Sequence, residues 1–278
     1  NEGIIDTAGV ASTVNTIKGS GGLTVVGGGT LTLNADNTAT LGGPVTIHSG
    51  TVKLGVVGGV PTGADVTVTS GGVLDLNAVD QTVGNLKLVG NGTVRNMSTT
   101  ANPTLTLTGD VQYVATGGVG VDYNNAPIYG AAIAGYDPGS GGAKRTLTID
   151  LGEDNRTFDV ADNPLVNTDL ALGFYDYYKY NYTNITGTGG LTKAGAGRMD
   201  IWTDPNWTGT PFSGGITVTG GTLGIRLSEA NDTALGDGTN VLSLLNDGRL
   251  VVMGTYSTSG RVASIEFSGN NVAQYSSW

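Results

Sequence analysis

The histidine is the first residue whose type could do chemistry. His48 is the only histidine among the 278 residues, so a Ser-His-Asp triad would have to use it. No Gly-x-Ser-x-Gly motif follows a strand pattern to supply the nucleophile. In the stretch 45–48, Val45 and Ile47 share one face, which places the imidazole on the opposite, polar face. We therefore expect an exposed histidine rather than a catalytic base.

Two aspartates are candidates for a catalytic carboxylate pair. Glycosidases use two carboxyl groups that face each other across the scissile bond. Asp75 in Leu-Asp-Leu and Asp200 in Met-Asp-Ile both alternate with apolar residues and point outward. Alternation alone also requires polar residues at these positions, so a non-enzymatic surface is favoured. A carbohydrate-active protein is the alternative.

An acidic run follows in the middle of the chain, between residues 150 and 176. Its members are Asp150, Glu153, Asp154, Asp159, Asp162, Asp169 and Asp176. Clustered oxygens suit calcium, but neither an EF-hand loop nor the Gly-Gly-x-Gly-x-Asp calcium repeat is present. A solvated acidic face is therefore favoured over a calcium site, and we expect no cofactor.

The densest aromatic stretch, residues 174–182, holds five of the eleven tyrosines. In an extended strand, Tyr178, Tyr180 and Tyr182 would share one face and Tyr177 the other. Tyrosine is common in contact surfaces, so these rings form our candidate interaction surface. Its residues are Phe174, Tyr175, Tyr177, Tyr178, Tyr180 and Tyr182. The alternative is a side sheet covered by the segment 117–142, with Tyr123, Tyr129 and Tyr136 as partners.

Short strands cut off by glycine must position these side chains. Residues 17–94 alternate apolar and polar residues between glycine-rich corners, and residues 185–253 repeat this pattern. Gly27–Gly29 and the stretch 195–197 occupy equivalent corners, with no following helix or Lys-Ser/Thr pair to indicate a phosphate loop. Between the copies lie residues 95–184, in which we expect Gly117–Gly142 to be a protruding loop or an irregular coil. Residues 254–278 are expected to form a partial last coil.

This pattern predicts an all-β protein, a single β-solenoid over residues 1–278. With ~20–25 residues per coil and ~4.8 Å between stacked strands, the chain would make about a dozen coils, ~55–60 Å long. Inward positions would form aliphatic rows, in which we include Phe158 and Val160. Both ends lack an evident cap, which predicts either a longer native protein or end-to-end pairing.

Composition excludes several classes of partner. A net charge of −10 disfavours nucleic acid, which needs a basic stripe, and also anionic membrane surfaces. No apolar run approaches ~18 residues, so we expect no transmembrane helix. The absence of cysteine excludes disulfides and is typical of a bacterial protein threaded unfolded across an envelope. Since the chain starts at Asn1 without Met, we expect a processed or excised piece.

The second copy carries a family resemblance. The stretches 185–201 (ITGTGGLTKAGAGRMDI) and 214–223 (GGITVTGGTL) resemble the autotransporter-associated beta strand repeat, also called the passenger-associated transport repeat. Residues 73–86 resemble its continuation, and residues 156–162 a strand often found before it. The resemblance implies a right-handed parallel β-helix exported to a bacterial surface in an adhesin-like or structural protein. No segment resembles the membrane barrel of autotransporters, so the export route stays open.

These observations favour a non-enzymatic extracellular module of a bacterial cell-surface protein. Its expected partners are copies of itself, other surface proteins or glycans. End-to-end association into a filament or sheath is one form of this hypothesis. A carbohydrate-binding or carbohydrate-active β-helix is the alternative.

Overall fold

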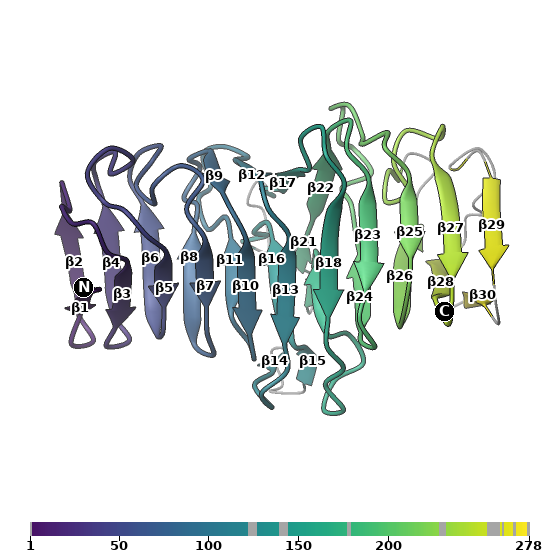
Figure 1. Ribbon diagram of the computed structural model, residues 1–278, viewed down its shortest axis with the longest axis horizontal. Coiled ribbons are helices and arrows are strands. Elements are labelled where there is room, and N and C mark those ends of the chain that lie inside the picture. The colour runs from purple at the N-terminus through teal and green to yellow at the C-terminus, as the bar shows by residue number, and fades with distance from the viewer. Residues whose placement is uncertain are drawn as a thin grey trace.

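The chain folds into a parallel β-helix. The computed structural model describes residues 2–121, 127–138, 144–176, 179–227, 232–254, 262, 264–268 and 271–276. Within them all regular secondary structure is β, dominated by two parallel 11-stranded sheets that lie against each other along the whole molecule (Figure 1). The near strands run down and the far strands run up while the chain advances from left to right, so the coil is right-handed.

Each coil contributes one strand to each of these two sheets. The first sheet contains β1 (Gly3–Asp6), β3 (Leu23–Val26), β5 (Val45–Ile47), β7 (Val66–Val68), β10 (Leu86–Val89), β13 (Val111–Val114), β18 (Arg156–Val160), β23 (Leu191–Ala194), β25 (Ile216–Val218), β27 (Val241–Leu245) and β29 (Ser264–Ser268). The second sheet contains β2 (Ala11–Val14), β4 (Thr30–Leu33), β6 (Gly50–Leu54), β8 (Gly72–Asp75), β11 (Thr93–Arg95), β16 (Ala131–Ala134), β19 (Leu170–Leu172), β24 (Arg198–Ile201), β26 (Thr222–Leu227), β28 (Arg249–Gly254) and β30 (Val272–Ser276). Strand order therefore follows chain order in both sheets.

Alternation determines which side chains enter the core. Val45 pairs with Val66 and Ile47 with Val68, and all four are buried, whereas the intervening threonines face outward. The same in-register stacking brings together apolar residues from neighbouring coils along the molecule, which is why a narrow coil has one continuous aliphatic core. Phe158 is fully buried in this core, as predicted.

A third sheet widens the middle of the molecule. It contains β9 (Gln81–Val83), β12 (Thr104–Leu107), β17 (Leu147–Asp150) and β22 (Thr183–Thr186), stacked in parallel. Two antiparallel hairpins extend from the same region. One pairs β14 (Gly120–Val121) with β15 (Pro127–Tyr129), and the other pairs β20 (Phe174–Asp176) with β21 (Lys179–Asn181). In the described part of the chain, the elements outside the two long sheets are therefore those of the central coils.

The segment 117–142 is not a loop throughout, so of the two expected arrangements, a protruding loop or an irregular coil, the second describes it better. It includes β16, which pairs with β11 and β19 inside the second sheet. All four residues of β16, Ala-Ala-Ile-Ala, are buried, because its outward face is covered as well as its inward face. A strand that is buried on both sides loses the alternation by which strands are recognised.

Glycine is required at the corners because backbones of neighbouring coils approach closely. Gly50 begins β6 with φ +76°, and a Cβ there would collide with the carbonyl oxygen of Gly29 in the preceding coil. Gly221, its equivalent in the second copy, has φ +61° and would collide with Gly197 in the same way. The glycine content therefore follows from the stacking of coils.

Among the described residues, no helix is long and apolar enough to cross a membrane.

Candidate functional site

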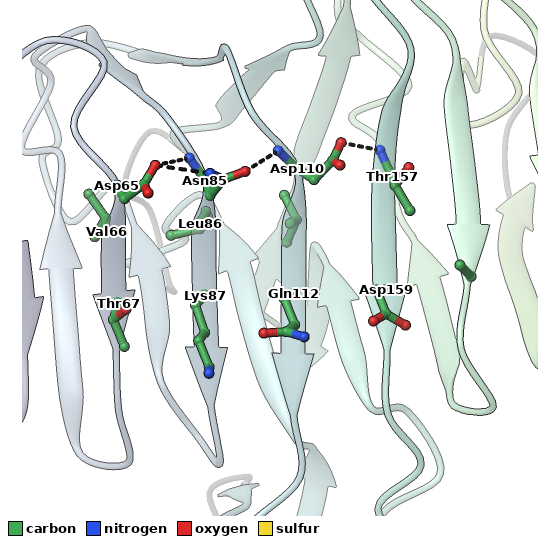
Figure 2. A pocket seen from close by; sticks show the side chains of 12 residues that line it. Asp65, Val66, Thr67, Asn85, Leu86, Lys87, Asp110, Gln112, Thr157 and Asp159 are labelled. Carbon is green, nitrogen blue, oxygen red and sulfur yellow. Dashed lines mark hydrogen bonds between the residues drawn. The ribbon is translucent and has the colours of Figure 1, made fainter. Parts of the chain in front are cut away.

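Two surface hollows are candidates for a binding site, and the larger, about 680 Å³, lies over the first sheet. Figure 2 shows that a chain of polar side chains runs along its upper edge. Asp65 accepts from the backbone N–H of Asn85 at 2.7 Å, and Asn85 accepts from that of Asp110 at 3.1 Å. Asp110 in turn accepts from the Thr157 N–H at 2.8 Å. These oxygens join consecutive coils, so this edge has a structural role.

The second hollow is a groove of about 480 Å³ over the outer face of the second sheet. We call it the aromatic groove. Its lining residues come from the two hairpins, from the loop before β19, and from β19, β24, β26, β28 and the residues that follow them. They are Ile128, Tyr129, Asn167, Thr168, Ala171, Gly173, Phe174, Tyr175, Asp200, Ile201, Trp202, Arg226 and Met253. Aromatic, aliphatic and charged side chains therefore meet at one place on the surface.

The hairpin β20–β21 builds one wall of the aromatic groove. It leaves the second sheet after β19 at Gly173, whose φ of +80° suits a glycine. A Cβ at Gly173 would collide with the Trp202 carbonyl oxygen and lie 3.0 Å from that of Asn181. The hairpin then pairs Tyr175 with Tyr180. Because the hairpin begins so close to the backbone of Trp202, its aromatic rings pack against residues of the next coil.

Four aromatic rings form a cluster beside the groove. Tyr175 lies 5.1 Å from Tyr180 and 5.7 Å from Trp202, measured between ring centroids. Tyr182 stacks on Tyr180 at 5.7 Å and meets Trp202 edge-on at 6.0 Å. Such spacings are favourable for aromatic pairs. Burial raises the pKa of the Tyr182 phenol well above its usual range, whereas Tyr175 is 39% exposed and presents its ring to solvent.

The opposite wall carries hydrogen-bonding groups. Asp200 forms an ion pair with Arg198 at 2.6 Å and accepts from the Thr168 hydroxyl at 2.5 Å. Asn167 is exposed at the rim. The carboxylate of Asp200 is thereby fixed in orientation, as a carboxylate in a binding site must be to select a ligand geometry.

Trp202 carries an unsatisfied donor at this groove. Its side chain is only 7% exposed, and its indole nitrogen is itself buried and has no hydrogen-bond partner among the described residues. Leaving a buried donor unpaired costs roughly 1–3 kcal/mol. A ligand oxygen that reached this nitrogen would recover that energy.

The predicted interaction residues are partly brought together here. Phe174 and Tyr175 line the groove, Tyr180 and Tyr182 lie behind it in the cluster, and Tyr177 and Tyr178 lie outside the described residues. The run is not one extended strand, because β20 and β21 fold back on each other. The alternative arrangement is also seen in part, since Tyr129 packs against Phe174 at 4.7 Å. Tyr123 lies outside the described residues.

Sequence reasoning missed two members of this site, Trp202 and Arg226. The guanidinium of Arg226 lies over the Trp202 ring, so the two residues form one unit beneath the hairpin. The sequence feature that could have identified Trp202 is a tryptophan at an outward position directly after β24. What the sequence does not reveal is that a hairpin from the preceding coil covers it.

The catalytic candidates are not brought together. His48 is exposed, as predicted, and Thr69 lies beside it, with its hydroxyl donating to the His48 carbonyl at 2.7 Å. Asp75 follows the outward alternation but is only 4% exposed, because it accepts from the backbone N–H groups of Asn77 and Met97. From β8 to β24 there are four strand steps, so Asp75 and Asp200 are about 19 Å apart or more. Glycosidase carboxyl pairs are separated by no more than ~9.5 Å.

The acidic run is spread over several strands and loops. Asp150 accepts from the Gly152 N–H, and Asp154 pairs with Arg156. Asp169 is buried and accepts from the N–H groups of Asn163 and Arg198, and its burial raises the pKa of the carboxyl. Over the part of the chain that the structure describes, no three His, Cys, Asp or Glu residues are grouped as metal ligands.

A buried lysine is a further feature that the sequence prediction passed over. Lys193 occupies an inward position of β23, in the row of Phe158 and Val218, and is fully buried. Its ammonium group donates to the carbonyl oxygens of Ala194, Gly195 and Gly220. Burial lowers the pKa of Lys193 to about 8, partly opposed by the charges of Asp169 and Asp159. These contacts tie the corner of one coil to the next.

Comparisons with known proteins returned no relative. No family model matches the chain, and neither the curated proteins nor the solved structures contain a match. The resemblance to the autotransporter-associated repeat therefore stays a prediction from the residues quoted above.

Proposed function

We propose that the chain is a non-enzymatic structural and adhesive module of a bacterial cell-surface protein. In this role the β-helix is a rod that holds a contact surface away from the cell. The observation that carries the proposal is the aromatic groove, which is built by insertions on an otherwise regular stack. Exposed loops that are held by a rigid scaffold are where binding sites are commonly found.

The state of the carboxylates supports binding rather than catalysis. Asp75 is engaged by two backbone N–H groups, and Asp200 by Arg198 and Thr168. Glycosidases use two carboxyl groups that lie on either side of the scissile bond, and Asp75 and Asp200 are on different parts of the second sheet. The repeat resemblance and the cysteine-free composition support an extracellular location in this proposal.

An adhesion assay tests this proposal. Purified chain would be coupled to microspheres, which are then passed over surfaces coated with polysaccharide, mucin or matrix protein, with uncoated microspheres as the control. We expect retention on at least one surface and no release of reducing ends from the polysaccharide. Equal retention of coated and uncoated microspheres would contradict an adhesive role, and new reducing ends would contradict the absence of catalysis.

End-to-end association is a second candidate, and the terminal strands favour it. Among the described residues of the first sheet, β1 pairs with β3 alone and β29 with β27 alone. These end coils carry exposed apolar side chains, including Ile4 at 70% and Phe267 at 56% exposure. A sheet edge with apolar residues is a template for pairing with another chain.

Electron microscopy of the purified chain would test this form of the proposal. We expect linear assemblies that shorten in an Ile4→Lys, Phe267→Lys double variant, because charge at a sheet edge opposes pairing. Monodisperse single particles at high protein concentration would contradict end-to-end assembly. That result would leave the adhesive role to be decided by the microsphere assay.

A further inference from the structure

The chemistry of the aromatic groove defines the kind of ligand it suits. The indole N–H of Trp202 can only donate a hydrogen bond, and the carboxylate of Asp200 can only accept one. Trp202 directly follows β24 and lies two residues after Asp200, so both side chains are on the same outer face. Two residues of extended chain separate their Cα atoms by about 7 Å. A ligand that reaches both must offer an acceptor and a donor within that distance. A row of hydroxyl groups does so, because each hydroxyl both donates and accepts.

The exposed ring of Tyr175 adds an apolar platform to these polar groups. Tyr175 lines the groove, and its ring centroid lies 5.7 Å from that of Trp202, so its platform adjoins the Trp202 ring. Phe174 and Tyr129 extend the aromatic wall. A sugar ring presents C–H groups on its face and hydroxyl groups around its edge. An aromatic ring complements the face, and polar side chains beside that ring complement the hydroxyl groups.

The sheet beneath the groove does not suit an extended peptide. Peptides that bind to β-structure add a strand to an open sheet edge. The floor strands β19, β24, β26 and β28 are each paired on both sides. Their backbone groups are therefore already engaged, which leaves side chains alone to make the contacts.

The charges of the groove are compensated, which favours a neutral ligand. Arg198 is paired with Asp200. Arg226 lies against the Trp202 ring and in the field of Asp232. An anionic sugar would have to be desolvated next to Asp200 without an unshared cation nearby, which is unfavourable.

We propose that the aromatic groove binds a neutral pyranose-based glycan. One sugar ring stacks on Tyr175, one of its hydroxyl oxygens accepts from the Trp202 N–H, and another hydroxyl donates to Asp200. This inference rests on the proposed adhesive function and names the ligand class of the same groove. It requires no bond to be made or broken.

Binding would be measured by titration calorimetry with a panel of neutral hexaoses. The probes are hexamers of glucose in α- and β-linkage, of mannose, of galactose and of N-acetylglucosamine, with an oligogalacturonate as the acidic comparison. We expect binding of at least one neutral hexaose with a dissociation constant below about 1 mM. Absence of binding by every neutral probe at about 10 mM overturns the proposal, as does binding of the oligogalacturonate alone.

Two variants locate the contact. Trp202→Phe keeps an aromatic ring and removes the N–H, and we expect about tenfold weaker binding. Tyr175→Ser removes the exposed platform and should weaken binding by a similar factor. Trp207→Phe is the matched control, because Trp207 does not line the groove, and its affinity should be unchanged. Unchanged affinity in both groove variants would overturn the assignment of the site.

Folding and function are kept separate in this design. Circular dichroism melting would check that each variant folds. Because Tyr175 is on the surface, the Tyr175→Ser variant still tests the site if Trp202→Phe does not fold.

Binding of a peptide library with no binding of hexaoses would also overturn the glycan assignment. If no hexaose binds but coated microspheres still adhere to a protein surface, this inference fails while the adhesive function stands. If neither occurs, both fail.

Discussion

The guanidinium carbon of Arg226 lies 3.8 Å from the centre of the Trp202 ring. The two residues come from adjacent strands of the second sheet, β26 and the end of β24. A cation stacked on a largely buried indole is worth roughly 0.5–2 kcal/mol. The pair therefore holds the floor of the aromatic groove in place as well as contributing to its surface.

Removing that cation should weaken the fold measurably. We expect Arg226→Met to lower the free energy of unfolding by about 1 kcal/mol in urea titrations, because the straight side chain remains but the charge is lost. Arg249→Met, at an exposed position of β28, should change it by less than about 0.5 kcal/mol. Equal effects of the two substitutions would show that the stacking contributes nothing.

Lys193 makes stability depend on pH in the alkaline range. Its folded pKa of about 8 lies below the unfolded value of about 10.4, so above pH 8 the unfolded chain binds more protons than the folded chain. Stability should therefore rise by about 2 kcal/mol between pH 7 and pH 9.5. Above about pH 10 the raised pKa of Tyr182 has the opposite sign, since the unfolded phenol then loses its proton first.

A substitution assigns this rise to Lys193. We expect the pH dependence to disappear in Lys193→Met, which removes the titrating group, and to persist in Lys87→Met, where the lysine is exposed. Urea unfolding followed by circular dichroism at both pH values measures it. A wild-type stability that is flat or falling over this range would contradict the lowered pKa of the buried Lys193.

Two glycines with the same backbone conformation should respond differently to alanine. Gly50 and Gly63 have φ of +76° and +77°, but only at Gly50 would a Cβ meet the preceding coil, 2.9 Å from the Gly28 carbonyl carbon. We expect Gly63→Ala to cost about 1 kcal/mol from backbone strain, and Gly50→Ala several kcal/mol in addition. Thermal unfolding of both variants tests this. Equal losses would mean that the corners tolerate a methyl group.

Asp75 should be a structural residue that tolerates amidation. Asp75→Ala leaves two backbone N–H groups without their acceptor, at Asn77 and Met97, and we expect a loss of roughly 1–3 kcal/mol. Asp75→Asn keeps one carbonyl oxygen in place and should lose less than half as much. Denaturant unfolding separates the two. A larger loss for asparagine than for alanine would contradict a hydrogen-bonding role.

The regular coils could be predicted from the sequence because local alternation and core burial coincide in them. Val45 and Ile47 are buried and the threonine between them is not, as the pattern predicts. Prediction failed where a strand is covered on both faces, as in the alanine-rich β16. The hairpin β20–β21 was also missed, since its apolar and aromatic residues carry no signal for a reversal of direction.

The site was predicted in part. Tyrosine density pointed to Phe174 and Tyr175, but Trp202 becomes part of the groove only because a distant hairpin packs over it. A contact between a hairpin and a residue of another coil produces no periodic pattern in the sequence. Lys193 is a different case, since its inward position can be inferred from Leu191 two residues earlier, and the signal was available.

The third sheet makes the molecule thicker at its centre than toward its ends. In the described part of the chain it accompanies only the coils that contain β8, β11, β16 and β19, and of the floor strands of the aromatic groove only β19 belongs to these coils. The resistance of a rod to bending increases steeply with its thickness. Under a sideways load the thinner coils beyond the third sheet should therefore curve first, and the groove, whose floor continues over β24, β26 and β28, should change its shape when the rod bends there.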